Sequence, residues 1–331
     1  MAGEFGTQFM PLMSICHFDG SWSKEELVSS DSLSLHPGAH VLHYASTCFE
    51  GLKAFRQTDG SVAIFRMEKN IERFVQSSNL LYLPAIDTEQ LARMITSSVA
   101  HFRDQVPDAP ASMYIRPTHI GTEPAIGKAA APTGTSSLYI LLSPVGDYFS
   151  SGEASLRLLL DDQGVRCGSD HGMVKGGGNY ASALKHIERA KVSVKADQVL
   201  FCPDGDVQET GAANFILVDG DEIITKSLDE SFLHGITRES ILTLAREKGL
   251  TVSERELSIS ELIERSANSG CEAGLTGTAA VVAAVGTLIH DGVEYPVGTG
   301  MPGPKIRAMR DELNGIQWGL IPDTLKWLTV V

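Results

Sequence analysis

Apolar and polar residues follow the two periods of regular secondary structure along the first part of the chain. The run VAIFRM (62–67) alternates and is rich in β-formers, which predicts a strand. Residues 68–81 carry charged and apolar side chains at helical spacing and end before Pro84. A second helix is predicted over residues 88–102, with Asp87 as its N-cap. We therefore expect strands and helices to be mixed here.

The next segments predict two strands and a domain boundary. SMYIRPTHI (112–120) is interpreted as a strand with a proline at its edge, and SSLYILLSPV (136–145) as a buried strand. The segment GDYFSSGEA (146–154) collects glycine, serine and charge, which is typical of a linker. We expect a small α/β domain over 11–145 and a larger domain over 155–331.

The second half repeats the mixed pattern. It begins with a predicted strand at 155–162, a glycine-rich segment at 168–178 and a helix over about 180–196. Short strands joined by the turn motifs PDGD and DGDE are expected at QVLFC (198–202), ANFILV (213–218) and EIIT (222–225).

Two more helices complete the prediction. Thr237 is expected to cap a helix that runs to Lys248 and stops at Gly249. A further helix is predicted over 259–266. The pattern predicts two α/β domains with a glycine-marked seam between them.

Composition narrows the classes of protein. Of the 331 residues, 43% are hydrophobic and 21% charged, which fits a soluble globular protein, and no apolar stretch is long enough to span a membrane. The net charge of −14 argues against nucleic acid and anionic membranes as partners. Five widely spaced cysteines without a CxxC argue against a disulfide framework or a zinc site and favour the reducing cytoplasm.

The opening MAGEFGTQFM (1–10) lacks the basic start and the apolar run of a secretory signal. We interpret it as vector-derived sequence and leave it out of the predicted fold.

Four short segments carry candidate chemistry. In Lys175–Tyr180 (KGGGNY) three glycines allow close backbone approach, and the lysine could bind phosphate or act as a nucleophile. Glu209–Asn214 places a carboxylate after a turn, and Gly235–Arg238 opens a helix whose free N–H groups favour anions. Gly277–Ala280 is a small-residue turn with a hydroxyl. Each segment alone is equally typical of an ordinary loop, cap or turn.

Together these segments resemble the fold-type IV pyridoxal-phosphate family, whose signature runs here from Glu209 through Asn214 to Arg238. Ile216 stands where an aromatic is usual, and as a predicted strand-core residue it should have little effect. Within that family the chain is similar to branched-chain aminotransferases. The matching motifs are LHYASTCFEGLKAF (42–55), IFRMEKNIERF (64–74), MYIRPTHIGTEPAIG (113–127), SPVGDYF (143–149), VKGGGNY (174–180), GITRESI (235–241) and IQWG (316–319) with Trp327.

The resemblance implies a two-domain α/β enzyme, with a small N-terminal α+β domain and a larger cofactor-binding domain built on a pseudo-barrel sheet. It implies transfer of the amino group of leucine, isoleucine or valine to 2-oxoglutarate with pyridoxal 5'-phosphate. The cofactor residues it implies are Lys175 for the Schiff base and proton transfer, Glu209 for the pyridine nitrogen, Tyr180 for the 3' oxygen, and Arg66, Ile236, Thr237 and Thr278 for the phosphate. The substrate residues it implies are Tyr44, Phe49 and Tyr148 as aromatic walls, and Tyr114, Arg116, Thr278 and Ala279 for carboxylates.

The resemblance also implies a homodimer, in which the partner's N-terminal domain closes the pocket. Two departures stand out: Asp170 and His171 are unusual before the lysine, and Ala280 and Ala283 stand where some relatives carry paired cysteines.

Three alternatives stay open at this point. A D-amino acid or (R)-amine transaminase, or an aminodeoxychorismate lyase, would share Lys175 and Glu209. A non-catalytic phosphate-ligand binding protein would use only the glycine loop and the helix start. A nucleotide-binding oxidoreductase is disfavoured, because no GxGxxG motif follows a strand and opens a helix.

Overall fold

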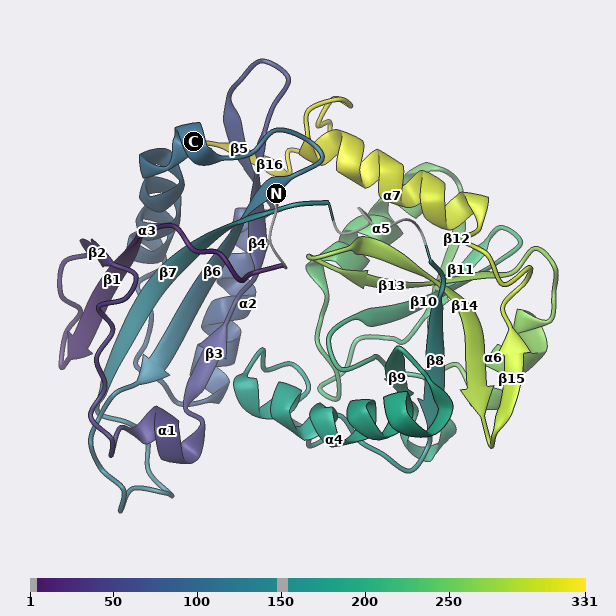
Figure 1. The fold of residues 1–331 in the computed structure, drawn as a ribbon, viewed down its shortest axis with the longest axis horizontal. Coiled ribbons are helices and arrows are strands. Elements are labelled where there is room, and N and C mark those ends of the chain that lie inside the picture. The colour runs from purple at the N-terminus through teal and green to yellow at the C-terminus, as the bar shows by residue number, and fades with distance from the viewer. Residues whose placement is uncertain (1–4, 148–153) are drawn as a thin grey trace. The chain divides into compact units, whose positions relative to one another are not determined.

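The computed structural model describes residues 5–147 and 154–331, and the fold is mixed α/β (Figure 1). Its contacts divide the chain into two compact units. The first unit holds residues 1–150, 174–177 and 315–331, and the second holds residues 151–173 and 178–314. No helix among the described residues is both long enough and apolar enough to cross a membrane.

The first unit is built on a sheet that has eight strands among the described residues. Neighbouring strands in it are antiparallel, and β3 pairs with β6 beside the main path. In sheet order the strands are β16 (Leu328–Val330), β5 (Val62–Phe65), β4 (Leu52–Arg56), β6 (Ser112–Gly121), β7 (Thr135–Val145), β1 (Leu12–Asp19) and β2 (Glu26–Ser29), with β3 (Thr47–Phe49) off the path. Its helices are α1 (His40–Tyr44), α2 (Met67–Leu80), α3 (Thr88–His101) and the short 3-10 helix η1 (Arg103–Gln105).

Helices α2 and α3 form as their sequences predict. Asp87 accepts hydrogen bonds from the N–H groups of Glu89 and Gln90 and so caps α3. Both helices bury one apolar stripe against the sheet, where residues such as Phe74, Leu91 and Met113 form the core. This packing fixes the position of α2 along the sheet.

The position of Pro117 is the one difference within β6. We expected the proline at an edge, but β6 is a central strand that pairs with β7 along its whole length. On the other side of β6, the pairing with β4 ends at Ile115 and the pairing with β3 begins at Thr118. Pro117, which has no N–H to donate, lies in that gap, and its carbonyl accepts the N–H of Glu50.

The second unit has its own sheet, again with eight strands among the described residues. In sheet order the strands are β12 (Thr251–Glu254), β11 (Glu222–Thr225), β10 (Asn214–Asp219), β13 (Glu272–Gly277), β14 (Val281–His290), β8 (Leu156–Asp161) and β9 (Gln198–Phe201), with β15 (Val293–Pro296) paired to β14. Its helices are α4 (Gly177–Val194), α5 (Ile236–Glu247), α6 (Ile259–Ser266), α7 (Pro304–Gln317) and the 3-10 helix η2 (Pro203–Gly205). Ile216 is fully buried in β10, as predicted.

One prediction in this unit is wrong. Thr237 does not cap α5, because the N-cap position belongs to Gly235 and no side chain caps this helix. The helix stop is confirmed, since Gly249 follows α5 with a φ of +78°.

Two segments belong to the first unit although we placed them elsewhere. Residues 315–331 were predicted as part of the second domain, but β16 pairs with β5 and Gln57 donates to the carbonyl of Gln317. Residues 1–10 were set aside as vector-derived, yet the N–H of Met10 donates to Leu142 and its side chain packs on the core. Neither pairing has a local sequence signal. The predicted linker at 146–154 falls largely outside the described residues.

Candidate active site

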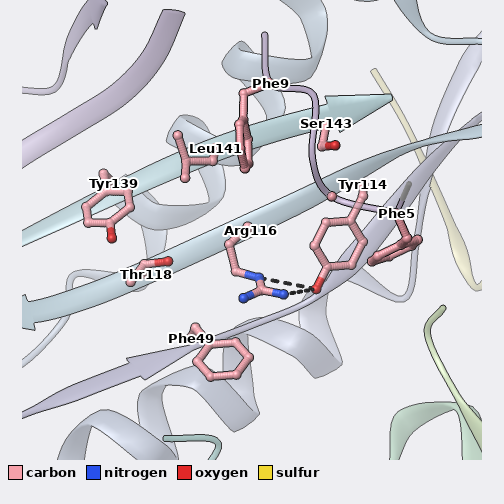
Figure 2. A pocket seen from close by; sticks show the side chains of 10 residues that line it. Phe5, Phe9, Phe49, Tyr114, Arg116, Thr118, Tyr139, Leu141 and Ser143 are labelled. Carbon is pink, nitrogen blue, oxygen red and sulfur yellow. Dashed lines mark hydrogen bonds between the residues drawn. The ribbon is translucent and has the colours of Figure 1, made fainter. Parts of the chain in front are cut away.

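A cavity in the first unit contains three of the predicted substrate residues. Phe49, Tyr114 and Arg116 line it, and its volume is about 360 Å³ (Figure 2). Its walls come from one face of the sheet: β6 contributes Tyr114, Arg116 and Thr118, and β7 contributes Tyr139, Leu141 and Ser143. Alternate residues of paired strands share a face, so the strand register itself assembles this wall.

Arg116 is the cation among the described residues that line the cavity. Its guanidinium donates to the Tyr114 hydroxyl from Nη2 at 2.7 Å and from Nε at 3.2 Å (Figure 2). The group also lies over the ring of Phe49, with 4.4 Å from Cζ to the ring centroid. An arginine held in this way keeps other N–H donors for a carboxylate.

The close approach of Tyr114 depends on Gly51, from the FEGLKAF motif. A Cβ added at Gly51 would overlap the Tyr114 hydroxyl. On the neighbouring strand, Lys53 lies opposite Tyr114 in the register. Burial lowers the pKa of Lys53 to about 8, although the nearby charge of Asp147 favours its protonated form.

The opening of the chain contributes residues that sequence reasoning missed. Phe5, Gly6 and Phe9 line the cavity, and the ring of Phe5 meets that of Tyr114 edge to face at 5.0 Å between centroids. Two aromatics just before the first strand were the available signal. Phe5 and Phe9 were not predicted, because residues 1–10 were interpreted as vector-derived and left out of the predicted fold.

Lys175 is fixed to the first unit through its backbone. Its N–H donates to the hydroxyl of Ser77 on α2 at 3.0 Å, and its carbonyl accepts the N–H of Phe49 at 3.0 Å. Its ammonium lies 5.1 Å from the centroid of the Phe49 ring, which also lines the cavity. Ser77, which is fully buried, had no motif that marked it.

Arg66 lies at the junction of β5 and α2. It is buried, it has a left-handed backbone conformation with φ +49°, and it is the N-cap residue of α2. A guanidinium in a buried position suits a phosphate.

In the second unit, the family signature folds into one buried cluster. Glu209 accepts hydrogen bonds from Arg166 at 2.6 Å, from the N–H of Leu233 at 2.9 Å and from Asn214 at 3.1 Å. Asn214 also donates to the carbonyl of Leu233, and a Cβ at Gly235 would overlap its side chain. In this chain, these contacts bring the glutamate, the asparagine and the glycine of the signature together.

Arg166 is the residue of this cluster that the motif did not predict. Its side chain and that of Glu209 are both almost fully buried. Burial works against the charge on Arg166, but the charge of Glu209, the hydrogen bond to it and smaller contributions from neighbouring groups together outweigh burial, so the pKa of Arg166 is raised. The phenol of Tyr180 contributes to the pKa of Arg166 in the same direction.

The remaining predicted residues of the second unit lie at turns and helix ends. Ile236 and Thr237 open α5, and Thr278 and Ala279 form the turn between β13 and β14. The helix start lacks a side-chain cap, so its first N–H groups and its dipole suit an anion.

Other predicted residues contribute less. Tyr44 does not line the cavity, and Tyr148 lies outside the described residues. Asp170 and His171 form a loose, solvent-facing pair with 3.5 Å between carboxylate and ring nitrogen. This exposure fits the interpretation of these two residues as a loop variant.

The donor set can be compared with the chemistry of pyridoxal phosphate. The first unit offers an amine and a buried guanidinium, in Lys175 and Arg66. The second offers a buried carboxylate with one Arg166 nitrogen, Nη1, left without a hydrogen-bond partner, and an uncapped helix start. The aldehyde of the cofactor needs an amine, its phosphate needs N–H donors, and its basic ring nitrogen needs a carboxylate. The residues therefore fit the cofactor.

Comparisons with known proteins agree with this chemistry. The family model "Amino-transferase class IV" matches residues 47–286. Branched-chain-amino-acid aminotransferase 2 of Bacillus subtilis is 37% identical over 336 residues, which cover 99% of this chain and 92% of that protein. The mitochondrial branched-chain-amino-acid aminotransferase of Schizosaccharomyces pombe is 36% identical, covering 97% of this chain and 79% of that protein.

Solved structures share the fold of this chain. A branched-chain amino acid aminotransferase solved with pyridoxamine 5'-phosphate, from the organism abbreviated T.th., superposes with a TM-score of 0.76 at 25% identity, covering 96% of this chain and 97% of that one. The fold also matches that of the Escherichia coli branched-chain aminotransferase, with a TM-score of 0.79 at 24% identity, covering 96% of this chain and 98% of that one. The chain belongs to the class IV aminotransferase family, among the branched-chain-amino-acid aminotransferases.

Proposed function

We propose that this aminotransferase moves the amino group of a branched-chain L-amino acid to 2-oxoglutarate, with pyridoxal phosphate bound at Lys175. The observation that carries the proposal is the cavity of the first unit. Aromatic and aliphatic walls suit a branched alkyl group, and the guanidinium of Arg116 suits a carboxylate. Among the similar proteins, several are named as branched-chain aminotransferases.

The cofactor residues are proposed in the roles that their surroundings support. Glu209 is assigned to the pyridine nitrogen because it is buried and held by three donors, one of which is the guanidinium of Arg166. Tyr180 is assigned to the 3' oxygen of the cofactor. The phosphate is assigned to Arg66, to the N–H groups of Ile236 and Thr237 and to the Thr278 hydroxyl. When bound, pyridoxal phosphate supplies the electron sink that makes the substrate Cα–H acidic.

The residues of the chain then have three tasks. The amine of Lys175 takes the proton from the substrate Cα and delivers it to the other carbon that is bonded to the transferred nitrogen. Hydrogen bonds to Ser77 and from Phe49 hold its backbone in place during both steps. Arg116 and Tyr114 orient a carboxylate, and the turn at Thr278 and Ala279 is assigned to carboxylate binding as well.

We further infer a homodimer in the cytoplasm. Tyr44 lies outside the cavity of its own unit, and its hydroxyl donates to the carbonyl of Ile126. Leu42 and Ile126 are 59% and 67% exposed, so this end of the unit offers apolar surface to a second copy. The five cysteines are unpaired thiols, which suits a reducing compartment. Light scattering that finds an active, purely monomeric protein would refute the dimer.

The first test is the absorbance spectrum of the purified protein with pyridoxal phosphate. Adding L-leucine without a keto acid should convert the visible band of the bound cofactor to the pyridoxamine form, and 2-oxoglutarate should restore it. A band that responds to D-alanine or an (R)-amine but not to L-leucine would favour the rival transaminases. Absence of any band would refute the assignment of Lys175, and a Lys175→Ala variant serves as the control.

A further inference from the structure

The backbone of Arg66 is held in an unfavourable conformation. A left-handed backbone costs a non-glycine residue roughly 1 kcal/mol or more and persists only where the surroundings enforce it. Here the N–H of Arg66 donates to the carbonyl of Trp327 at 2.7 Å, and its carbonyl accepts from the side chain of Asn70 at 2.9 Å. The C-terminal segment therefore helps to enforce this conformation.

Trp327 also contacts the side chain of Arg66. Its guanidinium carbon lies 4.9 Å from the centroid of the Trp327 ring. The ring in turn meets Phe65 edge to face at 5.6 Å and 89°. Leu328, the next residue, pairs with Phe65 in the sheet, and its N–H donates to Asp323 at 2.8 Å. Trp327 is thus held through its ring and through the residue that follows it.

A guanidinium that lies over an aromatic ring is attracted to it through its charge, and this contact uses none of its N–H groups as hydrogen-bond donors. Bidentate phosphate binding uses those N–H donors. The contact with Trp327 therefore holds the Arg66 guanidinium in place without using the groups that bind phosphate.

We propose that Trp327 is the positioning residue of the phosphate site, holding the Arg66 guanidinium in place through its ring and its carbonyl. This rests on the proposed function, in which Arg66 binds the cofactor phosphate. No role in binding was assigned to the C-terminal segment from its motif. Under this proposal, that segment sets the affinity for the phosphorylated cofactor.

The test compares two ligands that differ only in the phosphate. Dissociation constants of pyridoxal phosphate and of pyridoxal are measured on the cofactor-free protein from the visible band. Trp327→Leu should weaken the binding of pyridoxal phosphate by about 2- to 30-fold, the range of cation–π contacts from exposed to desolvated sites, and leave the binding of pyridoxal unchanged. Trp327→Phe, which keeps a ring, should give a smaller change in the same ratio.

Matched controls separate positioning from general packing. Trp318 lies in the same segment, with its ring 6.4 Å from that of Phe55, so Trp318→Phe should leave the ratio unchanged. In an Arg66→Met background, which removes the cation, Trp327→Phe should have no further effect on the ratio. Equal weakening of both ligands, or an effect on the ratio that persists in the methionine background, would overturn the proposal. Failure of the unaltered protein to bind pyridoxal phosphate would instead refute the proposed function.

Discussion

Replacing Arg166 by methionine should destabilise the protein strongly and in a pH-dependent way. The substitution keeps most of the side-chain volume but leaves the carboxylate of Glu209 buried without its cation. Breaking a buried ion pair from one side costs about 3–5 kcal/mol. Glu209 keeps two other donors, the N–H of Leu233 and the amide of Asn214, so we expect the lower end, about 3 kcal/mol.

The sign of the pH effect follows from the unpaired charge. In Arg166→Met, protonation of Glu209 relieves the buried charge, so the deficit relative to the unaltered protein should shrink as the pH falls from 8 towards 5. A double variant, Arg166→Met with Glu209→Gln, leaves no buried charge and should recover part of the loss.

Urea unfolding of the cofactor-free protein, followed by circular dichroism, measures these differences. Circular dichroism is needed because all three tryptophans lie in the first unit, whereas Arg166 and Glu209 lie in the second. The same deficit at pH 8 and pH 5, together with a double variant no more stable than Arg166→Met, would refute the reasoning.

Three further predictions concern the first unit. Gly51→Ala should displace the Tyr114 hydroxyl and raise the KM for 2-oxoglutarate, with a loss of about 1–3 kcal/mol in unfolding free energy; unchanged kinetics and stability would contradict it. Ser77→Ala leaves the N–H of Lys175 without its acceptor, so kcat should fall more than KM changes, and a change confined to KM would argue against this role. Burial lowers the pKa of His119 to about 3, so the unfolded chain takes up the proton first and stability should decline as the pH falls below about 6.5. His119→Asn should flatten that decline by up to about 1.4 kcal/mol per pH unit in urea titrations, and an unchanged slope would refute it.

Local signals in the sequence predicted the elements but not their partners. The cap at Asp87 and the helix at Ile259–Ser266 were predicted correctly because the information lies within a few residues. The N-cap of α5 was misassigned to Thr237, since a glycine at that position carries no polar side chain to reveal it. Pro117 was misplaced because its tolerance depends on where β3 and β4 end, far away in the chain.

The site shows the same division between local and distant information. The motifs predicted Phe49, Tyr114 and Arg116, and the cavity contains all three. Arg166 and Ser77 could not be predicted, because their roles arise only from contacts with residues more than 40 positions away. A resemblance carries over the residues of a motif but not the buried groups that hold them.

The pairing of β16 with β5 also has a consequence for the order of folding in the cell. Residues 328–330 leave the ribosome after the whole second unit has been made. In the folded protein they cover one side of β5, whose four residues, VAIF, are all buried. Until then, β5 presents an uncovered apolar edge of the kind that invites intermolecular pairing. The first unit can therefore complete its sheet only after residues 328–330 have been made, and until then β5 is a candidate site for aggregation of the nascent chain.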